Sequence, residues 1–256
     1  MDLNQLAPEI LIYIALPIIM FVAFEVGYQV GRRRAQGKPE EREGPTGMLV
    51  GSMLALMAFL IAIVMGMTID RFDARRGLVV DEANAIGTAY LRAGYINPQI
   101  GEPVRELLRE YLPLRITIPD AAQLSANLDA SMGLTDQMWT LTEEEARTNP
   151  NSEVTGLFVD SINEVINVQT ARATAIDARV PQPIIFFVVF GSVLAISLVG
   201  YHAGLMLRRS LVAAVLLVLL FSTVIALVID LNQPASGLFV VNQKPFTTLQ
   251  SQIGPP

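Results

Sequence analysis

Residues 65–77 read MGMTIDRFDARRG, and this stretch decides how the chain is organised. An apolar run ends at Ile69, and five charged residues follow within positions 70–76. The sequence then continues as LVVDEANAIGTAYLRA (78–93), which keeps a helical spacing of apolar residues and contains no proline. We therefore expect one helix that leaves a lipid bilayer near residue 69 and continues into water.

The composition agrees with a membrane protein. Hydrophobic residues make up 52% of the 256 positions and charged residues only 16%, and the mean hydropathy is +0.46. The absence of cysteine excludes a disulfide framework, and a single histidine excludes a histidine-based metal cluster. The net charge of −6 argues against a nucleic-acid partner.

No motif points to catalysis. The sequence contains no glycine-rich phosphate loop, no HExxH motif and no Ser/His/Asp or Cys/His set, since its one histidine, His202, lies at the end of an apolar stretch. We therefore expect no enzymatic activity, no metal and no cofactor.

Four stretches are long enough to cross a bilayer, which takes about 20 apolar residues. They lie at about residues 10–31, 48–69, 184–207 and 211–229. The first is preceded by no basic residue and followed by no small-residue cleavage site, so we expect it to be retained as a membrane helix. The four spans predict two transmembrane hairpins, within residues 1–69 and 184–230, and a C-terminal tail of residues 231–256.

Residues 70–183 have a different character. They carry 10 basic and 17 acidic residues, a net charge of −7, and their spacing of apolar residues is helical. Pro103 and Pro119 are expected near helix starts. The fold class predicted is thus an all-α integral membrane protein, with four transmembrane helices in two hairpins and a helical soluble domain inserted between spans two and three.

The basic residues predict an orientation. Seven of them lie in the two hairpin loops, whereas the N-terminal tail has none. The positive-inside rule therefore places the loops in the cytoplasm, and both termini and the helical domain outside it.

The second span presents three lines of residues at roughly 100° per residue. Small residues form a stripe suited to close helix packing: Gly47, Gly51, Ala55, Ala58, Ala62 and Gly66. Larger residues on the opposite side are expected to face lipid: Met53, Leu54, Met57, Leu60, Ile61 and Val64. A third line consists of Ser52, Leu56, Phe59, Ile63, Met67 and Asp70. This third line either packs against another span or forms a pore wall, with Phe59 and Ile63 as an apolar constriction that gates by dewetting.

The first span contains an acidic residue, Glu25. A charge at the centre of a bilayer is costly, about 2.5–3.5 kcal/mol on insertion scales. Glu25 either lies close to the interface, hydrogen-bonded to Tyr28 or Gln29, or forms an ion site. Gly27 and Gly31, one helical turn apart, supply another pair for close packing.

Three segments carry a resemblance to a known family. They are AIVMGMTIDRFDARRGLVVDEANAIG (62–87), TARATAIDARVPQPI (170–184) and IDLNQPASGLFVVNQKPFTTL (229–249). Together they resemble the bestrophin-like family of bacterial integral membrane proteins, which are distant relatives of the bestrophin channels. Asp70, Arg71 and Phe72 match the exit of the second span in that family.

The resemblance implies a pentameric ion channel lined by the second span, with a hydrophobic neck. The neck falls on Ala55, Phe59 and Ile63, followed by Met67, and Asp70 with Arg71 would form the pore mouth. A ring of Asp70 carboxylates favours cations. The implied partners are membrane lipids, small inorganic ions and further copies of the chain, and the implied location is the bacterial inner membrane. The family also implies a cytosolic helical domain, but we keep the orientation that the loop charges predict.

Two alternatives follow from how this sequence differs. Bestrophins have polar, asparagine-containing residues after the neck, whereas this chain reads Met65, Gly66 and Met67. A non-conducting membrane scaffold or sensor, whose acidic helical domain binds a partner protein, is therefore an alternative function. A secondary transporter is less favoured, because no inverted repeat or pair of broken helices is evident beyond Pro17.

Overall fold

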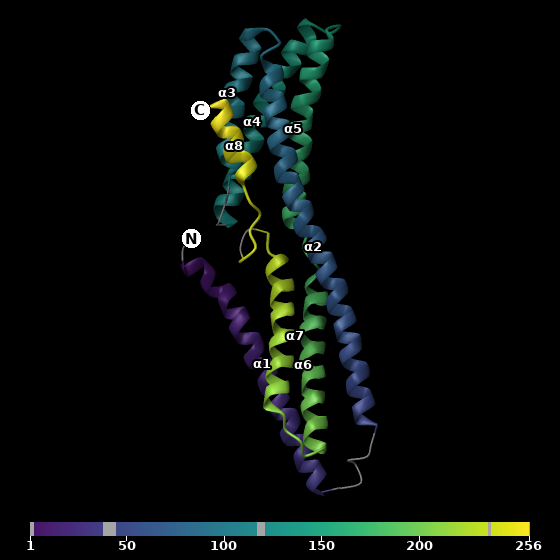
Figure 1. Cartoon of the computed structure of the whole chain (residues 1–256). Coiled ribbons are helices and arrows are strands. Elements are labelled where there is room, and N and C mark those ends of the chain that lie inside the picture. The colour runs from purple at the N-terminus through teal and green to yellow at the C-terminus, as the bar shows by residue number, and fades with distance from the viewer. Residues whose placement is uncertain (1–2, 38–44, 117–120, 235–236, 256) are drawn as a thin grey trace. The chain divides into compact units, whose positions relative to one another are not determined.

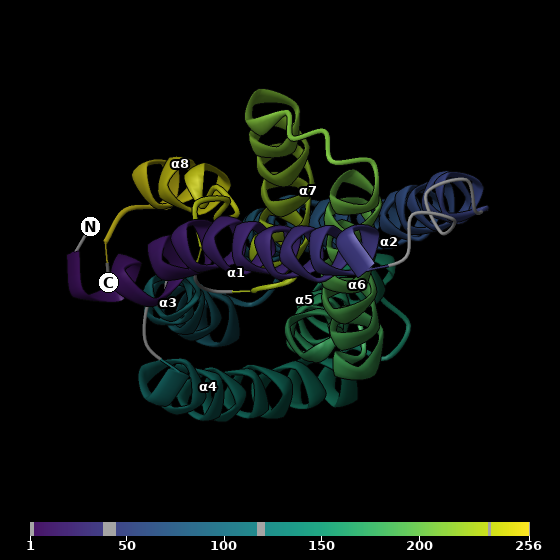
Figure 2. The same ribbon diagram turned by 90° about the horizontal axis from the view of Figure 1, so that it is seen from below.

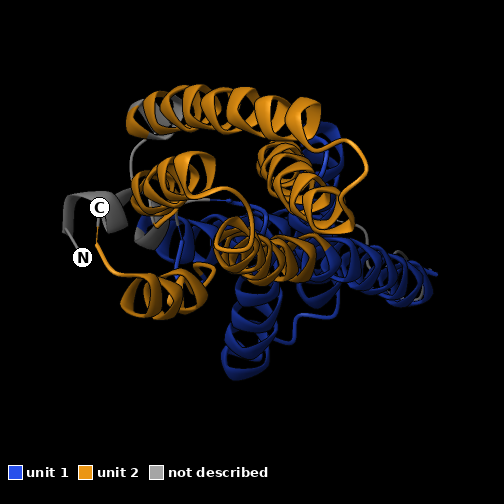
Figure 3. Cartoon of the chain, turned by 90° about the horizontal axis from the view of Figure 1, so that it is seen from above, with its two compact units in different colours: residues 1–70, 179–239 blue, residues 71–178, 240–256 orange. Residues whose placement is uncertain are grey.

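The computed structural model describes four ranges of the chain, residues 3–37, 45–116, 121–234 and 237–255. All regular secondary structure in these ranges is helical (Figure 1). The chain forms two compact units, each with its own hydrophobic core (Figure 3). Unit 1 consists of residues 1–70 and 179–239, and unit 2 of residues 71–178 and 240–256.

Unit 1 contains the apolar helices. They are α1 (Leu3–Gly37), the first part of α2 (Thr46–Ala93), α6 (Gln182–Leu205) and α7 (Leu211–Leu231). Four helical stretches are long and apolar enough to cross a membrane: Leu11–Gln36, Thr46–Ala93, Glu153–Leu205 and Leu211–Leu231. The expectation of four apolar helices is thus confirmed by length and composition.

Helices α1 and α6 make the most extensive contact in unit 1, where they lie side by side (Figure 1 and Figure 2). Two glycines of α1, Gly27 and Gly31, lie directly against backbone carbonyls of Ser197 and Tyr201 on α6. Reciprocally, Gly200 and Gly204 of α6 lie against the carbonyls of Phe24 and Tyr28 on α1. A methyl group on any of these glycines would overlap the facing backbone, so the two helices approach this closely only because all four side chains are absent.

Side chains hold the segment that follows α7. The Asp230 carboxylate accepts backbone hydrogen bonds from Leu238 (3.0 Å) and Phe239 (3.2 Å). Immediately before Leu238, Gly237 has φ +121°, and a Cβ at this position would meet the same carboxylate at 2.7 Å. Glycine is therefore required for this turn. Asn232 accepts a hydrogen bond from the backbone N–H of Val180 (2.7 Å), which joins the end of α7 to the segment before α6.

Unit 2 is a bundle of amphipathic helices. The second part of α2 is joined by α3 (Pro98–Arg115), α4 (Ala121–Thr148), α5 (Glu153–Asp177) and α8 (Lys244–Ile253). Helix α3 packs against α4 and α8, and α4 packs against α5. Large side chains fill the core, among them Ile86, Leu108, Tyr111, Leu112, Met138, Phe158, Ile162 and Phe246.

Helix boundaries agree with the sequence in some places and differ in others. Helix α2 is continuous from Thr46 to Ala93, as the sequence predicted. The prediction of a helix start at Pro103 was wrong, because α3 begins at Pro98, where the Asn97 side chain caps the N–H of Gln99 (3.0 Å). Pro119 lies outside the described residues. Helix α8 was not expected within the predicted tail. It begins at Lys244, has Pro245 in its first turn, and buries Phe246, Leu249 and Ile253.

Candidate pore helix and a buried charge cluster

One face of the second apolar helix is covered by the chain itself. Within unit 1, α2 buries Met57, Ile61, Val64 and Thr68, and Ile61 and Val64 belong to the core that α1, α6 and α7 share. The expectation that Met57, Ile61 and Val64 face lipid was therefore wrong. Helical periodicity had identified a large apolar face, but in a bilayer both lipid and neighbouring spans accept such a face, so sequence alone cannot separate them.

The opposite face of α2 is uncovered. Phe59 is 63% exposed and Ile63 is 45% exposed, Ala55 is exposed and Met67 is half-buried. Further along the helix, Asp70 is exposed and Arg71 is half-buried. Ala55, Phe59 and Ile63 thus lie on the side of α2 that unit 1 leaves free, whereas Met67 packs partly against the core of that unit.

Most of the small-residue stripe of α2 makes no close helix contact within the described part of the chain. A Cβ added at Gly51 or Gly66 would have no neighbour within 4 Å, whereas one added at Gly47 would lie 3.2 Å from the His202 ring of α6. Ala58 and Ala62 are exposed. The role of the stripe in helix packing stays a prediction, and it now concerns packing between subunits.

Glu25 is paired. Its Oε2 accepts a hydrogen bond from Arg209 Nη2 at 2.8 Å, and its Oε1 contacts Gln29 Nε2 at 3.5 Å. The Arg209 guanidinium also lies over the Tyr28 ring, 5.3 Å from its centroid. The positive charge of Arg209 balances the negative charge of Glu25. This pairing favours a structural role for Glu25 near the membrane interface over a role as an ion site.

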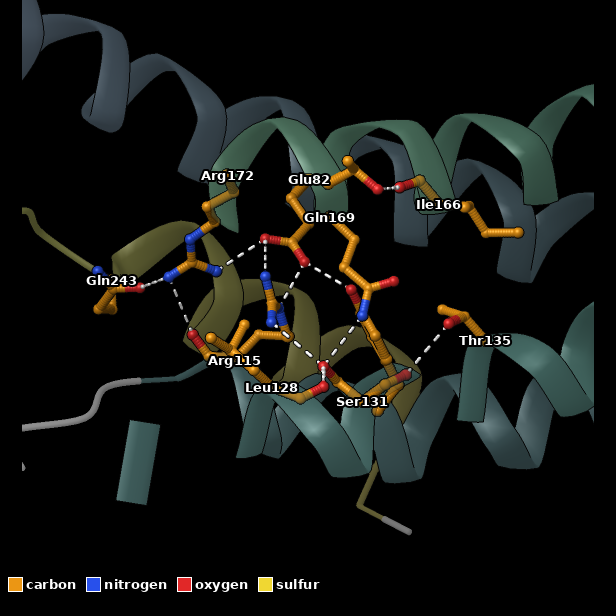
Figure 4. Close-up of polar contacts among 11 residues, drawn as sticks. Glu82, Arg115, Leu128, Ser131, Thr135, Ile166, Gln169, Arg172 and Gln243 are labelled. Atoms are coloured by element: carbon orange, nitrogen blue, oxygen red, sulfur yellow. Dashed lines mark hydrogen bonds and ion pairs between the residues drawn. The ribbon is translucent and has the colours of Figure 1, made fainter. Parts of the chain in front are cut away.

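A buried carboxylate lies at the centre of unit 2. Glu82 of α2 has no exposed surface, and it receives hydrogen bonds from side chains of α3 and α5 (Figure 4). Arg115 Nε at the end of α3 lies 2.6 Å from Oε1, and the Tyr111 hydroxyl lies 2.7 Å from the same oxygen. Arg172 Nη1 from α5 lies 2.7 Å from Oε2. One acid therefore fixes α2, α3 and α5 to one another.

A second layer of hydrogen bonds surrounds this centre (Figure 4). The buried Ser131 hydroxyl of α4 accepts from Arg115 Nη1 (3.3 Å) and from Gln169 Nε2 (3.0 Å). Arg172 Nη2 donates to the Arg115 carbonyl and to Gln243 Oε1, both at 3.2 Å. Through Gln243 the cluster also holds the segment that enters α8.

The electrostatics keep Glu82 ionised. Burial on its own would raise the pKa of the Glu82 carboxyl, but Arg115, Arg172 and the Tyr111 hydroxyl together lower this pKa below its ordinary value. Burial and the Glu82 charge raise the pKa of Tyr111 well above its ordinary value, so its hydroxyl stays protonated and donates. Burial lowers the pKa of Arg172, and the attraction of Glu82 opposes this shift.

The cluster is suited to holding helices together, because its hydroxyl groups, Tyr111 and Ser131, already take part in hydrogen bonds within it. Among the described ranges of the chain no three His, Cys, Asp or Glu side chains come together as metal ligands. Sequence reasoning missed Glu82, although a signal existed. Glu82 lies three residues after the buried Val79 and four before the buried Ile86, on the core side of the helix.

Comparison with known proteins assigns the family. The model of the bestrophin-like domain matches residues 18–246. The chain belongs to the bestrophin-like family. No match was found among curated proteins.

Solved structures of bestrophin homologues share the fold of this bestrophin-like protein. Three crystal structures of a bacterial bestrophin homologue from Klebsiella pneumoniae, each with a different single substitution, are similar to it. The first has a TM-score of 0.69 at 14% identity and covers 94% of either chain. The second has a TM-score of 0.68 at 15% identity, and the third 0.67 at 14%, each covering 92% of this chain and 95% of the other. At this identity the likeness concerns the fold. The family and the apolar helices make this bestrophin-like chain a membrane protein related to channels rather than to enzymes.

Proposed function

We propose that this chain is one subunit of an oligomeric ion channel whose pore is lined by the second span. The observation that carries the proposal is the free face of α2. This helix buries Met57, Ile61 and Val64 within its own unit and leaves Phe59 and Ile63 uncovered on the other side. Copies of the chain arranged around an axis would bring these free faces together, and the bestrophin-like family supports such a ring.

In this arrangement Ala55, Phe59, Ile63 and Met67 line the narrow part of the pore. Rings of large apolar side chains gate a pore by dewetting, because a narrow apolar passage does not hold water. Asp70 and Arg71 lie at the mouth, and a ring of Asp70 carboxylates gives a preference for cations. A pentamer is the stoichiometry that the resemblance to bestrophins supports.

The same proposal includes a membrane topology. Four spans in two hairpins carry the helical domain between spans two and three, in a bacterial inner membrane. The arginines of the hairpin loops face the cytoplasm, and both termini and the helical domain lie on the other side. Cysteines placed at the exposed positions Gln36 and Ala126, in otherwise cysteine-free protein, test this topology. Labelling from the same side of the membrane would contradict it.

One observation favours the alternative of a non-conducting scaffold or sensor. Thr68 is the first hydroxyl-bearing residue after the neck positions, and it is fully buried, donating to the carbonyls of Val64 (3.1 Å) and Met65 (2.9 Å). It therefore offers no polar group to a pore. In this alternative the acidic helical domain binds a partner protein.

Purified protein in liposomes tests the channel directly. We expect flux of a small monovalent cation, and we expect Phe59→Ala to raise it, because the smaller ring of side chains holds water. Leu216→Ala, at an exposed position of α7, is the matched control and should leave flux unchanged. Intact oligomers without flux, in wild type and in Phe59→Ala alike, would overturn the channel and favour the scaffold.

A further inference from the structure

The first part of α2 contacts α6 at two glycines. At one contact, the His202 ring of α6 lies over Gly47, and a Cβ added to this glycine would lie 3.2 Å from Cε1 and 3.3 Å from Nε2 of the ring. At the other contact, Met57 of α2 packs into the space left by Gly191, where an added Cβ would lie 2.7 Å from the methionine sulfur. Gly47 and Met57 are about 15 Å apart along α2, at 1.5 Å per residue.

Between these two contacts an open groove separates the helices. It has a volume of about 390 Å³ and is lined by residues of α1 and α6 and by Met53 of α2. No residue of α2 from Thr46 to Leu56 is buried, whereas Met57 and Ile61 are. The first three turns of α2 therefore depend on the His202 contact for their position.

The His202 ring is suited to this contact when it is neutral. Its Nδ1 atom is buried and has no hydrogen-bond partner in the described ranges of the chain. A neutral imidazole leaves one ring nitrogen without a proton, whereas the imidazolium carries an N–H on both nitrogens. A buried N–H without an acceptor is costly, and Gly47 has no side chain that could accept this hydrogen bond. Protonation therefore opposes the contact.

The charged groups of the adjoining segments do not offset this cost. The first three turns of α2 and the first five turns of α7 contain no titratable residue. The titratable side chains in the other adjoining segments, as far as the structure describes them, are Glu25, Tyr28, Arg32, Arg33 and Arg34 of α1, Tyr201 of α6, and Arg208 and Arg209 after α6. Glu25 is the one carboxylate in this set, and Arg209 already donates to it at 2.8 Å.

We propose that the contact of His202 with Gly47 is a pH-sensitive switch, in which protonation of the ring releases the first turns of α2 from α6. Histidine is the side chain that ordinarily changes its charge between pH 5 and 8, and His202 is the single histidine of the chain. The same helix carries Phe59 and Ile63, so release at low pH displaces the start of the proposed pore helix. This consequence rests on the proposed function, whereas the switch itself does not.

Hydrogen exchange of the full-length protein in neutral detergent tests the switch at pH 7.5 and 5.5, with labelling times scaled to the intrinsic exchange rate at each pH. We expect protection of residues 48–54 in the wild type to fall by about tenfold at the lower pH. Residues 211–218 of α7, which contain no titratable group, are the internal control and should keep their protection. His202→Gln stays neutral and should remove the response. His202→Lys is charged at both pH values and should give low protection at both.

A second measurement needs only the wild type. Because the chain has one histidine, nuclear magnetic resonance of an isotope-labelled imidazole follows its protonation directly, and the loss of protection should follow the same titration. A loss of protection at a different pH would overturn the proposal, even if neither variant folds. Unchanged protection in the wild type would also overturn it. So would an equal response in His202→Gln, which would assign the response to other groups, such as the carboxylates that precede α2 in the sequence. Neither measurement depends on ion flux, so these outcomes leave the proposed channel untouched.

Discussion

The α1–α6 crossing and the Glu82 cluster hold their respective units together in opposite ways. The crossing has four glycines and direct backbone contact. The cluster has a fully buried carboxylate, two guanidinium groups and a tyrosine hydroxyl. The first contains no charged side chain at the point of contact, and the second is organised by charge.

The surrounding medium explains this difference. Lipid is as apolar as a leucine side chain, so burial of apolar surface contributes little free energy to the association of membrane helices. Close packing of their backbones has to supply this free energy instead. In the topology proposed above unit 2 lies in water, where burial of apolar side chains already drives its helices together. A buried ion pair then fixes the orientation of the helices, because a buried charge is tolerated only where all of its partners are in place.

Removing the central carboxylate should have the largest effect. Glu82→Ala leaves Arg115 and Arg172 buried without their counter-ion, and loss of one partner of a buried pair costs about 3–5 kcal/mol. We expect faster hydrogen exchange throughout the core of unit 2, around Leu108 and Phe158, and a lower unfolding temperature. Glu164→Ala is the control, because this acid on α5 is exposed. Equal effects of the two substitutions would show that burial of Glu82 does not organise unit 2.

The same carboxylate predicts a pH dependence. The pKa of Glu82 in the folded protein lies below its ordinary value of 4.5, so the folded state binds fewer protons at this site than the unfolded state. Its contribution to stability is present above the unfolded pKa and is lost as pH falls through the folded pKa. The difference in unfolding free energy between wild type and Glu82→Gln should be constant from pH 7 to about 5 and should shrink below it. Denaturant unfolding at several pH values measures this difference in unfolding free energy. A difference that grows as pH falls would show that the pKa of Glu82 is raised in the folded protein and not lowered.

The crossing should respond to size rather than to charge. Gly200→Leu overlaps the Phe24 carbonyl, and overpacking of this kind typically costs about 1–3 kcal/mol. We expect a lower unfolding temperature in detergent without any pH dependence. Gly51→Leu is the matched control on α2, where nothing lies within 4 Å of an added Cβ.

Gly51→Leu also separates two roles of the small-residue stripe. If the stripe packs against a neighbouring copy, this variant keeps the fold of unit 1 but loses oligomers in native mass spectrometry. If oligomers persist and unit 1 is destabilised as strongly as by Gly200→Leu, Gly51 does not lie on the side of α2 that unit 1 leaves uncovered.

Local sequence patterns predicted much of the fold. The apolar stretches and the continuous helix through Ile69 follow from hydropathy and the absence of proline, and Gly27 with Gly31 followed from spacing. Their partners Gly200 and Gly204 have the same spacing, but only the fold shows that these two pairs, distant in sequence, meet. Pairing between distant segments is a tertiary property that one sequence does not carry.

The missed features have the same cause. Glu82 stands next to the exposed Asp81, and a run of acids on an amphipathic helix usually faces water. Only the burial of Val79 and Ile86 on the same side distinguishes it. Helix α8 is short, and the burial of its three apolar residues depends on packing against α3 and the core of unit 2, which the tail sequence does not reveal.

Removing the charge of Glu25 from the Glu25–Arg209 pair should have the smallest effect on stability. Unlike Glu82, this pair is partly open, with 40% of the Arg209 side chain and 27% of the Glu25 side chain exposed. Glu25→Gln leaves an arginine that can extend its charge into water along its apolar stem, and exposed pairs contribute about 0–1 kcal/mol. We therefore expect a change in unfolding temperature several-fold smaller than that of Glu82→Gln under the same conditions. Tyr28→Leu, which removes the ring beneath Arg209 but neither charge, is the control for packing. Equal losses from Glu25→Gln and Glu82→Gln would mean that the first unit also depends on charge, and the division between packing in lipid and pairing in water would fail.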